Sequence, residues 1–308
     1  MLSYLPYACP PELLERARSS KPTATAVAGA GGKVALESAR RAAAAGLIEP
    51  VLIGPPGVVE ALAREIGWDL AGLRIVPAGE DQAVAETAVA LARGREVAAV
   101  MKGQVPTNVL MRAVVDRETG LRTGQRLSHV FHMTVPGRAG AVAISDAAVN
   151  VAPDVETRLH ITRNAVALMH ALGEAEPRVA ILSATEHASD AMPSSREAEE
   201  IARRASGGEV EGALVEGPLA LDLAISPQAA EIKGVESPVA GKADILIVPN
   251  IETGNALFKS MVYYLSATAA GLVMGAKVPI ILTSRADPPE ARLAAVALAA
   301  IVAGHGGG

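Results

Sequence analysis

Four apolar segments of the chain end in clusters of polar residues whose types suit the binding of a small anion. The clusters span residues 102–107, 145–150, 250–259 and 283–287, and between them they combine lysine and arginine with hydroxyl and amide side chains. Each cluster lies beside the predicted start of a helix, where backbone N–H groups add positive charge. In an open α/β sheet, ligands collect beyond the carboxyl ends of the strands. The four clusters together favour a phosphate or similar anion, although each one alone also fits a solvated strand end.

The glycine-rich loop at residues 29–33 matches neither of the common nucleotide-binding motifs. A dinucleotide fingerprint needs glycine at position 34, and a P-loop needs glycine at position 27 with serine or threonine at position 34. The chain has Val27 and Val34 at these positions. We therefore predict a tight turn between a strand and a helix, with a helix start that faces an anion as the alternative.

The histidine and cysteine residues do not form a metal-binding pattern. His129 and His132 lie on a predicted strand at an odd spacing, so their rings are expected to point to opposite faces. The single cysteine, Cys9, excludes an intrachain disulfide and a cysteine-based metal cluster. The sequence therefore predicts no metal site.

The composition limits the class of protein. The chain has 308 residues, of which 50% are apolar, 20% are charged and 2% are aromatic, and its formal net charge is −5. The apolar fraction excludes intrinsic disorder, and the scarcity of aromatic residues and of positive charge argues against nucleic acid as a partner. The first twenty residues show no basic segment followed by an apolar one, so no signal peptide is expected. We expect a soluble cytoplasmic α/β protein without a membrane partner.

The polar clusters must be positioned by strands and helices that alternate along the chain, which is typical of parallel βαβ units. Strands are predicted at residues 23–30, 50–54, 73–79, 96–103, 127–135, 139–148, 178–185, 212–218, 243–250 and 277–285. Helices are predicted at residues 33–46, 58–67, 81–94, 106–115, 154–172, 194–206, 252–274 and 289–303.

The middle of the chain departs from simple alternation. The strands at 127–135 and 139–148 are joined through Pro136-Gly137, so an antiparallel hairpin is expected there. Asp154 is the expected N-cap of the helix that follows. The stretch 227–243 is polar and rich in glycine and proline, which predicts a surface excursion. The uncharged run 260–276 is too short for a membrane span and is predicted to be part of a buried helix.

The sequence resembles the phosphate acetyltransferase and phosphate butyryltransferase family in six segments. These segments are residues 101–114, 120–130, 144–154, 216–226, 243–260 and 276–299. Their order, spacing and chemistry agree with the family, and the resemblance runs from about residue 23 to the last helix. The form of segment 120–130 is closer to the butyryl-type branch, which also contains proteins called phosphate acetyltransferases.

The resemblance implies a reversible acyl transfer, in which acyl-CoA and phosphate give an acyl phosphate and CoA. Coenzyme A would be a substrate, and no permanently bound cofactor is implied. The implied fold has two α/β domains with a cleft between them, similar to the isocitrate and isopropylmalate dehydrogenases, and the family enzymes are homodimers. We expect residues 1–138 with 277–308 to form the first domain and residues 139–276 to form an inserted second domain.

The resemblance also implies roles for individual residues. Ser284 and Arg285 match the catalytic pair of the family, with Arg285 binding the phosphoryl group and Ser284 donating a hydrogen bond to the reacting group. The implied substrate-binding residues are Lys102, Gly103, Thr107, Arg122, Thr123, Ser128, His129, Asn250, Asn255 and Lys259.

The sequence departs from the acetyl-type enzymes at the expected base for the CoA thiol. Those enzymes have an aspartate seven residues after the catalytic serine, where this chain has Ala291. Asp287 is the expected substitute, and its alternative role is to cap the last helix. A thiol is already a good nucleophile and leaving group, so the reaction needs modest help at this step.

Two other functions stay open on the sequence alone. One is an NAD-dependent dehydrogenase of the same fold, which would usually need a divalent metal held by clustered aspartates, and the chain has no Asp-x-x-x-Asp set. The other is a non-catalytic domain that senses CoA or an acyl phosphate. The absence of a carboxylate at position 291, where the chain has Ala291, is consistent with such a domain.

Overall fold

The fold was taken from a computed structural model that describes residues 5–283 and 286–306. The chain divides into two compact units. The first, here called the β1 unit, consists of Tyr7–Gln125 and Ala270–Gly308, and the second, the β5 unit, consists of Met1–Pro6 and Arg126–Ala269. The sequence predicted domain boundaries near residues 138 and 277, and that domain assignment stays a prediction.

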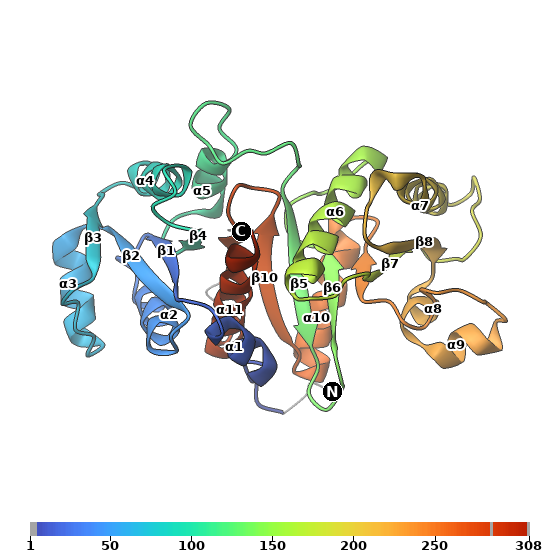
Figure 1. The fold of residues 1–308 in the computed structure, drawn as a ribbon, viewed down its shortest axis with the longest axis horizontal. Helices are drawn as coiled ribbons and strands as arrows, with labels where there is room; N and C mark the ends of the chain where they lie inside the picture. Colours follow the sequence, from blue (N-terminus) through green and yellow to red (C-terminus); the bar gives the residue numbers. More distant parts are fainter. Residues whose placement is uncertain (1–4, 284–285, 307–308) are drawn as a thin grey trace. The chain divides into compact units, whose positions relative to one another are not determined.

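The β1 unit is a mostly parallel sheet flanked by helices (Figure 1). Its strands lie in the order β3 (Arg74–Pro77), β2 (Ile48–Gly54), β1 (Thr23–Ala28), β4 (Ala99–Lys102), β11 (Ile280–Ile281) and β10 (Thr268–Met274). Its helices are α1 (Pro11–Arg18), α2 (Lys33–Ala44), α3 (Pro56–Glu65), α4 (Asp81–Arg93), α5 (Thr107–Val114) and α11 (Pro289–His305). The predicted alternation of strands and helices is confirmed in this unit.

The order of the strands places a crossover between β1 and β4. The chain moves outward from β1 to β2 and β3, and it then returns to pair β4 with the other side of β1. The loops that follow β1 and β4 therefore lead to helices in opposite directions, which opens a crevice at the carboxyl ends of these strands.

The last helix, α11, is covered within the β1 unit. Figure 1 shows α11 in dark red beside α1 and α2, and it contacts both helices. Its middle is a run of alanine, valine and leucine in which every residue from 294 to 300 is buried. A helix that is apolar on all sides is stable when its neighbours bury all of them, which is the case here.

The strands of the β5 unit lie in the order β5 (Ser128–Thr134), β6 (Ala141–Ser145), β9 (Ile245–Ile247), β7 (Arg178–Leu182) and β8 (Leu214–Leu219). Its helical segments are α6 (Val155–Ala171), α7 (Pro193–Arg204), the π-helix η1 (Ala205–Glu209), α8 (Leu221–Ile225), α9 (Pro227–Ile232) and α10 (Ile251–Leu265). Strands β5 and β6 are antiparallel, which confirms the predicted hairpin, and the other pairs are parallel.

The predicted helix at 252–274 is wrong in its second half. Helix α10 ends at Leu265, Ser266 adopts a left-handed conformation with φ +52°, and the chain continues as strand β10. The Ser266 hydroxyl donates to the carbonyl of Leu5 at 2.8 Å, which holds this break in place. An uncharged apolar run has the same hydrophobicity in a buried helix and in a buried strand, so its pattern could not separate the two.

The stretch 227–243 is also more ordered than predicted. It forms helix α9 and then buries Val239 and Ala240 against the core of the β5 unit. Ser226 caps α9 by accepting a hydrogen bond from the backbone of Ala229 at 3.2 Å. In the part of the chain that the structure describes, no helix is long and apolar enough to cross a membrane.

Candidate functional site

Two adjoining hollows lie at the carboxyl ends of the β1-unit strands. The smaller, of about 250 Å³, has walls from the start of α2, the end of β4, Thr283 and Arg292. The larger, of about 620 Å³, lies over the loops that follow β1, β2, β3 and β4. Lys102 and Gln104 line both hollows, so the two are neighbours at the crossover between β1 and β4.

The loops that follow β1 and β4 are packed directly against each other. The Gly103 amide donates to the carbonyl of Ala28 at 2.7 Å, and the Gln104 amide donates to the carbonyl of Gly29 at 2.8 Å. A Cβ atom on Gly103 would lie 2.5 Å from the Gly29 carbonyl oxygen, so only glycine fits there. Gly103 therefore has a packing role, because it lets the loops after β1 and β4 meet beside the smaller hollow.

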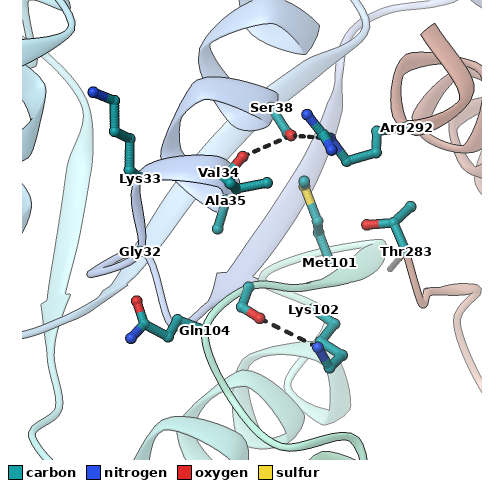
Figure 2. Close-up of a pocket in the computed structure, with 11 residues that line it drawn as sticks. Gly32, Lys33, Val34, Ala35, Ser38, Met101, Lys102, Gln104, Thr283 and Arg292 are labelled. Carbon is teal, nitrogen blue, oxygen red and sulfur yellow. Dashed lines mark hydrogen bonds between the residues drawn. The ribbon is translucent and has the colours of Figure 1, made fainter. Parts of the chain in front are cut away.

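The smaller hollow contains an arginine that the sequence reasoning missed. Arg292, in the first turn of α11, donates from Nε to Ser38 Oγ at 2.9 Å and from Nη1 to the carbonyl of Asp287 at 2.6 Å. Ser38 in turn donates to the carbonyl of Val34 at 2.7 Å. Figure 2 shows Arg292 and Thr283 on one side of this hollow and the start of α2 on the other. The only sequence signal for Arg292 was its place as a basic residue shortly after the Ser284-Arg285 pair.

The predicted residues at the end of β4 line these hollows. Lys102 and Gly103 contribute to the smaller hollow, and Lys102 and Thr107 contribute to the larger one. Thr107 is the first residue of α5, and the N-cap before it, Pro106, makes no side-chain hydrogen bond to the helix. The structure thus brings Lys102, Gly103 and Thr107 together, while their roles in binding stay predictions.

The predicted catalytic pair, Ser284 and Arg285, lies outside the described residues. The residue before the pair, Thr283, lines the smaller hollow. Asp287, two residues after the pair, is half-buried and is held through its backbone carbonyl by Arg292. The N-cap of α11 is Pro288, which makes no side-chain hydrogen bond, so Asp287 is not the N-cap residue that the sequence offered as an alternative.

Arg122 and Thr123 lie beside the turn between β10 and β11. Arg122 is exposed and forms an antiparallel bridge with Ala276. Thr123 donates from Oγ1 to the carbonyl of Gly275 at 2.6 Å and accepts a hydrogen bond from the backbone of Gln125. The structure gives Thr123 a role in fixing this loop within the β1 unit.

In the β5 unit, Ser128 and His129 are buried at the start of β5. Ser128 accepts a hydrogen bond from the Asn164 amide at 2.8 Å, and the His129 ring lies 4.2 Å from that of Phe131. His132, farther along the same strand, is half-buried, and desolvation lowers the pKa of its imidazole to about 4. His132 is therefore neutral at neutral pH and adds no positive charge.

Asn250 is the N-cap of α10, and Asn255 and Lys259 lie within this helix. Asn250 caps the helix by accepting from the backbone and the hydroxyl of Thr253, at 2.9 and 2.7 Å. Asn255 donates to the carbonyl of Ala147 at 3.4 Å, and the exposed Lys259 ammonium lies 6.0 Å from the Phe258 ring centroid. The start of α10 is thus joined to the loop that follows β6.

Asp146 organises that loop after β6. Its buried carboxylate accepts hydrogen bonds from the backbone amides of Ala148, Val149 and Asn150 at 2.9, 3.0 and 3.2 Å. The Asn150 side chain donates to Asp146 at 2.7 Å and to the carbonyl of Leu127 at 2.9 Å. The polar cluster at 145–150 is therefore largely occupied with its own backbone.

The described residues contain no group of three or more histidine, cysteine, aspartate or glutamate side chains placed to hold a metal ion. Cys9 is half-buried, and desolvation, with a smaller contribution from Glu290, raises the pKa of its thiol to about 11. The Cys9 thiol is therefore protonated at neutral pH.

Comparison with known proteins places the chain among acyl-transferring enzymes. The family described as "Phosphate acetyl/butaryl transferase" matches residues 83–300. A phosphate acetyltransferase of Rhizobium meliloti is 46% identical over 94% of this chain and 92% of its own length. A phosphate butyryltransferase of Clostridium acetobutylicum is 37% identical over 96% of this chain and 98% of its own length.

Solved structures agree with this relationship. A branched-chain phosphotransacylase from Enterococcus faecalis V583 is 31% identical, with a TM-score of 0.80 over 91% of this chain and 99% of its own. A 4-hydroxythreonine-4-phosphate dehydrogenase from Klebsiella pneumoniae has a TM-score of 0.59 over 91% of this chain and 99% of its own at 13% identity, which is a likeness of fold alone. The mixed α/β fold is thus shared with a dehydrogenase, whereas the sequence relatives are acyltransferases.

Proposed function

This chain belongs to the phosphate acetyl/butyryl transferase family, and from that premise we propose how its residues transfer a short acyl group between coenzyme A and inorganic phosphate. The single observation that carries the function is the identity of 46% to a phosphate acetyltransferase over 94% of the chain. The family relatives support the acyltransferase and give no support to the dehydrogenase or to the sensing domain. Relatives of both names match, so acetyl and butyryl groups are both proposed substrates.

In the proposed reaction a phosphate oxygen attacks the carbonyl carbon of the thioester. The new bond between oxygen and carbon forms a tetrahedral anion, whose collapse breaks the carbon–sulfur bond and releases the CoA thiolate, which then takes up a proton. Arg285 binds the phosphate through two parallel hydrogen bonds, and Ser284 donates to the reacting group as charge develops. Because both substrates are held in one complex, positioning supplies much of the rate enhancement.

Residues of the β1 unit support this site in the proposal. Lys102 brings a cation to the crossover, and Gly103 and Thr107 shape the loop beside it. Arg122 and Thr123 are proposed to contact phosphate or CoA from the loop next to Gly275. The proposal uses no metal and no bound cofactor in the reaction.

Residues of the β5 unit complete the proposed set. Asn250 and Asn255 present amides at the start of α10, and Lys259 presents a cation one turn farther on. Ser128 and His129 are proposed to contribute from β5. Two α/β domains with the reaction in a cleft between them, a homodimer and a cytoplasmic location are parts of this proposal that rest on the family resemblance.

The base for the CoA thiol is proposed to be Asp287. Ala291, at the position of the acetyl-type aspartate, is buried in α11 and has no ionisable group. Asp287 is the first acid after the catalytic pair, whereas Glu290, the next one, is paired with Arg41 of α2 at 3.3 Å. An Asp287→Asn variant tests this role, and we expect its kcat to fall while the KM for phosphate is unchanged.

The function is tested by phosphate-dependent release of CoA from acetyl-CoA and butyryl-CoA in the presence of EDTA. We expect release to require phosphate and to fall by a factor of about 10³ in an Arg285→Ala variant, which corresponds to about 4 kcal/mol. Arg64→Ala, which removes an exposed arginine of α3, is the matched control and should retain wild-type rates. Release that does not need phosphate, or that survives in Arg285→Ala, would contradict the proposed roles. CoA binding without any release would favour the sensing domain.

A further inference from the structure

We propose that Arg292 is a positioning residue for the acyl transfer, because it fixes the segment 286–288 that joins the catalytic pair to α11. This inference rests on the proposed function and adds a residue for which the family resemblance implied no role. Arg292 acts through the backbone of Asp287, which is the proposed base and lies two residues after Arg285. The proposal gives Arg292 no contact with the reacting atoms.

Arg292 holds two successive carbonyl groups of this segment. Its side chain donates from Nη1 to the carbonyl of Asp287 at 2.6 Å, and its backbone amide donates to the carbonyl of Pro288 at 3.1 Å. The two residues after Asp287 are Pro288 and Pro289, whose rings fix their φ angles. Because the Asp287 carbonyl is held and the next two φ angles are set, the place of Asp287 before α11 is well defined.

The same guanidinium is anchored to α2 through Ser38. Arg292 donates from Nε to Ser38 Oγ at 2.9 Å, and the buried Ser38 hydroxyl donates to the carbonyl of Val34 at 2.7 Å, one turn earlier in α2 (Figure 2). The hydroxyl hydrogen of Ser38 is thus used within α2, and its oxygen accepts from Arg292. A guanidinium is planar and rigid, so bonds from two of its nitrogens to two different elements fix its plane.

The anchor on α2 relates Asp287 to the other proposed site residues of the β1 unit. Helix α2 follows the loop after β1, and that loop is hydrogen-bonded to Gly103 and Gln104 in the loop after β4. Lys102, at the end of β4, is therefore part of the same framework as Ser38. Without Arg292 the segment 286–288 loses its tie to this framework. A displacement of about 1 Å in an active site can cost about 100-fold in rate, which sets the size of effect to expect.

A second tie between the same two helices supplies a matched control. Glu290 in the first turn of α11 pairs with Arg41 of α2 at 3.3 Å, with side chains 33% and 43% exposed. Arg41→Ala removes an arginine that bridges α2 and α11 but leaves the Asp287 carbonyl and its partner in place. An exposed ion pair of this kind contributes little to stability, so this variant should fold and react as the wild type does.

The experiment measures kcat and the KM for acetyl-CoA in phosphate-dependent CoA release by the full chain, with circular dichroism to show that each variant is folded. We expect Arg292→Ala to lower kcat by about 10–100-fold and to change this KM less than twofold, since Arg292 touches no substrate in the proposal. Arg41→Ala should keep kcat within twofold of the wild type. Guanidinium chloride at a low concentration should restore several-fold of the lost rate in Arg292→Ala, whereas sodium chloride should not. Guanidinium is a denaturant, so it would only weaken a variant that is merely less stable.

Ser38→Ala shows whether the two bonds of Arg292 act as one unit. This variant should lower kcat less than Arg292→Ala does, and adding it to Arg292→Ala should lower kcat no further. The inference alone is overturned if the wild type is active and Arg292→Ala stays within twofold of it, if Arg41→Ala loses as much activity, or if guanidinium restores nothing. A wild-type protein without phosphate-dependent release of CoA would refute the proposed function, and this inference with it.

Discussion

Replacing Arg158 by methionine is expected to stabilise the β5 unit. Arg158 lies in the first turn of α6, and its side chain is completely buried. Among the described residues its Nε and Nη2 atoms have no hydrogen-bond partner, and its one ion pair joins Nη1 to Glu197 at 3.4 Å. Burial of a guanidinium with two unsatisfied donors costs more than one long ion pair returns. Methionine has a similar length and removes this cost.

The size of the effect follows from the pKa of Arg158. Desolvation by burial lowers that pKa from 12.5 to about 10. Keeping the group charged at neutral pH therefore costs the folded state roughly 3 kcal/mol, at about 1.4 kcal/mol for each pKa unit. Glu197 is 42% exposed, so water can solvate its carboxylate when the arginine is gone. Allowing for imperfect packing of methionine, we expect the free energy of unfolding to rise by about 1–3 kcal/mol.

The assay is urea unfolding of the full chain, followed by circular dichroism at pH 7.5 and again at pH 10.5. The advantage of Arg158→Met should shrink at the higher pH. A basic group whose pKa is lowered in the folded state destabilises the fold below that pKa, and this destabilisation decreases as the pH rises through the folded-state pKa. Arg163→Met on the same helix is the control. Arg163 is 27% exposed and donates to the Glu209 carbonyl at 2.6 Å, so its loss should destabilise by about 1 kcal/mol.

A fall in stability of more than about 1 kcal/mol in Arg158→Met would refute the reasoning, because it would mean that the guanidinium is satisfied. Glu197→Gln gives an independent check. It should destabilise the fold, since the buried charge of Arg158 then loses its one ionic partner.

Three further outcomes follow from the structure. Gly103→Ala should lower the free energy of unfolding by about 1–3 kcal/mol because the new methyl group meets the carbonyls of Ala28 and Gly29. The control Gly57→Ala, which has open space around its Cβ, should not lower it. Equal urea midpoints for the two variants would contradict the packing role of Gly103. Asp154→Ser should keep the cap of α6 but reduce the loss of stability in acid. Hydrogen bonds from Thr157 lower the pKa of Asp154 in the folded chain. The contribution of Asp154 to the free energy of unfolding is therefore present above the ordinary carboxyl pKa and is lost as the pH falls through the folded-state pKa. An unchanged slope of stability against pH below pH 5 would refute this. Cys9 has a thiol pKa of about 11 in the folded chain, so it should react with iodoacetamide at pH 8 about a hundredfold more slowly there than in urea. Equal reaction rates, measured by mass spectrometry, would show that the folded thiol is accessible and ionised.

Local pattern was sufficient to predict much of the fold. The alternation of β-branched and alanine-rich segments predicts the βα units because the side-chain periods of strands and helices differ. Asp154 was identifiable as a cap from its position before the first helical turn, and its side chain accepts from Thr157 at 2.8 Å. The polar clusters at the ends of strands were identifiable for the same reason, since chain order alone places them after apolar segments.

Features that depend on distant parts of the chain were decided only by the tertiary structure. The end of α10 depends on a contact between Ser266 and Leu5, and the need for glycine at position 103 depends on the backbone after β1. The reach of Arg292 to Ser38 joins residues 254 positions apart in the chain. A sequence specifies the side chain that each position carries, but which groups meet it is decided by how the sheets and helices pack. The family resemblance could therefore name Lys102 and Thr107, whereas the two hollows that they line emerged only once the strands were ordered around β1.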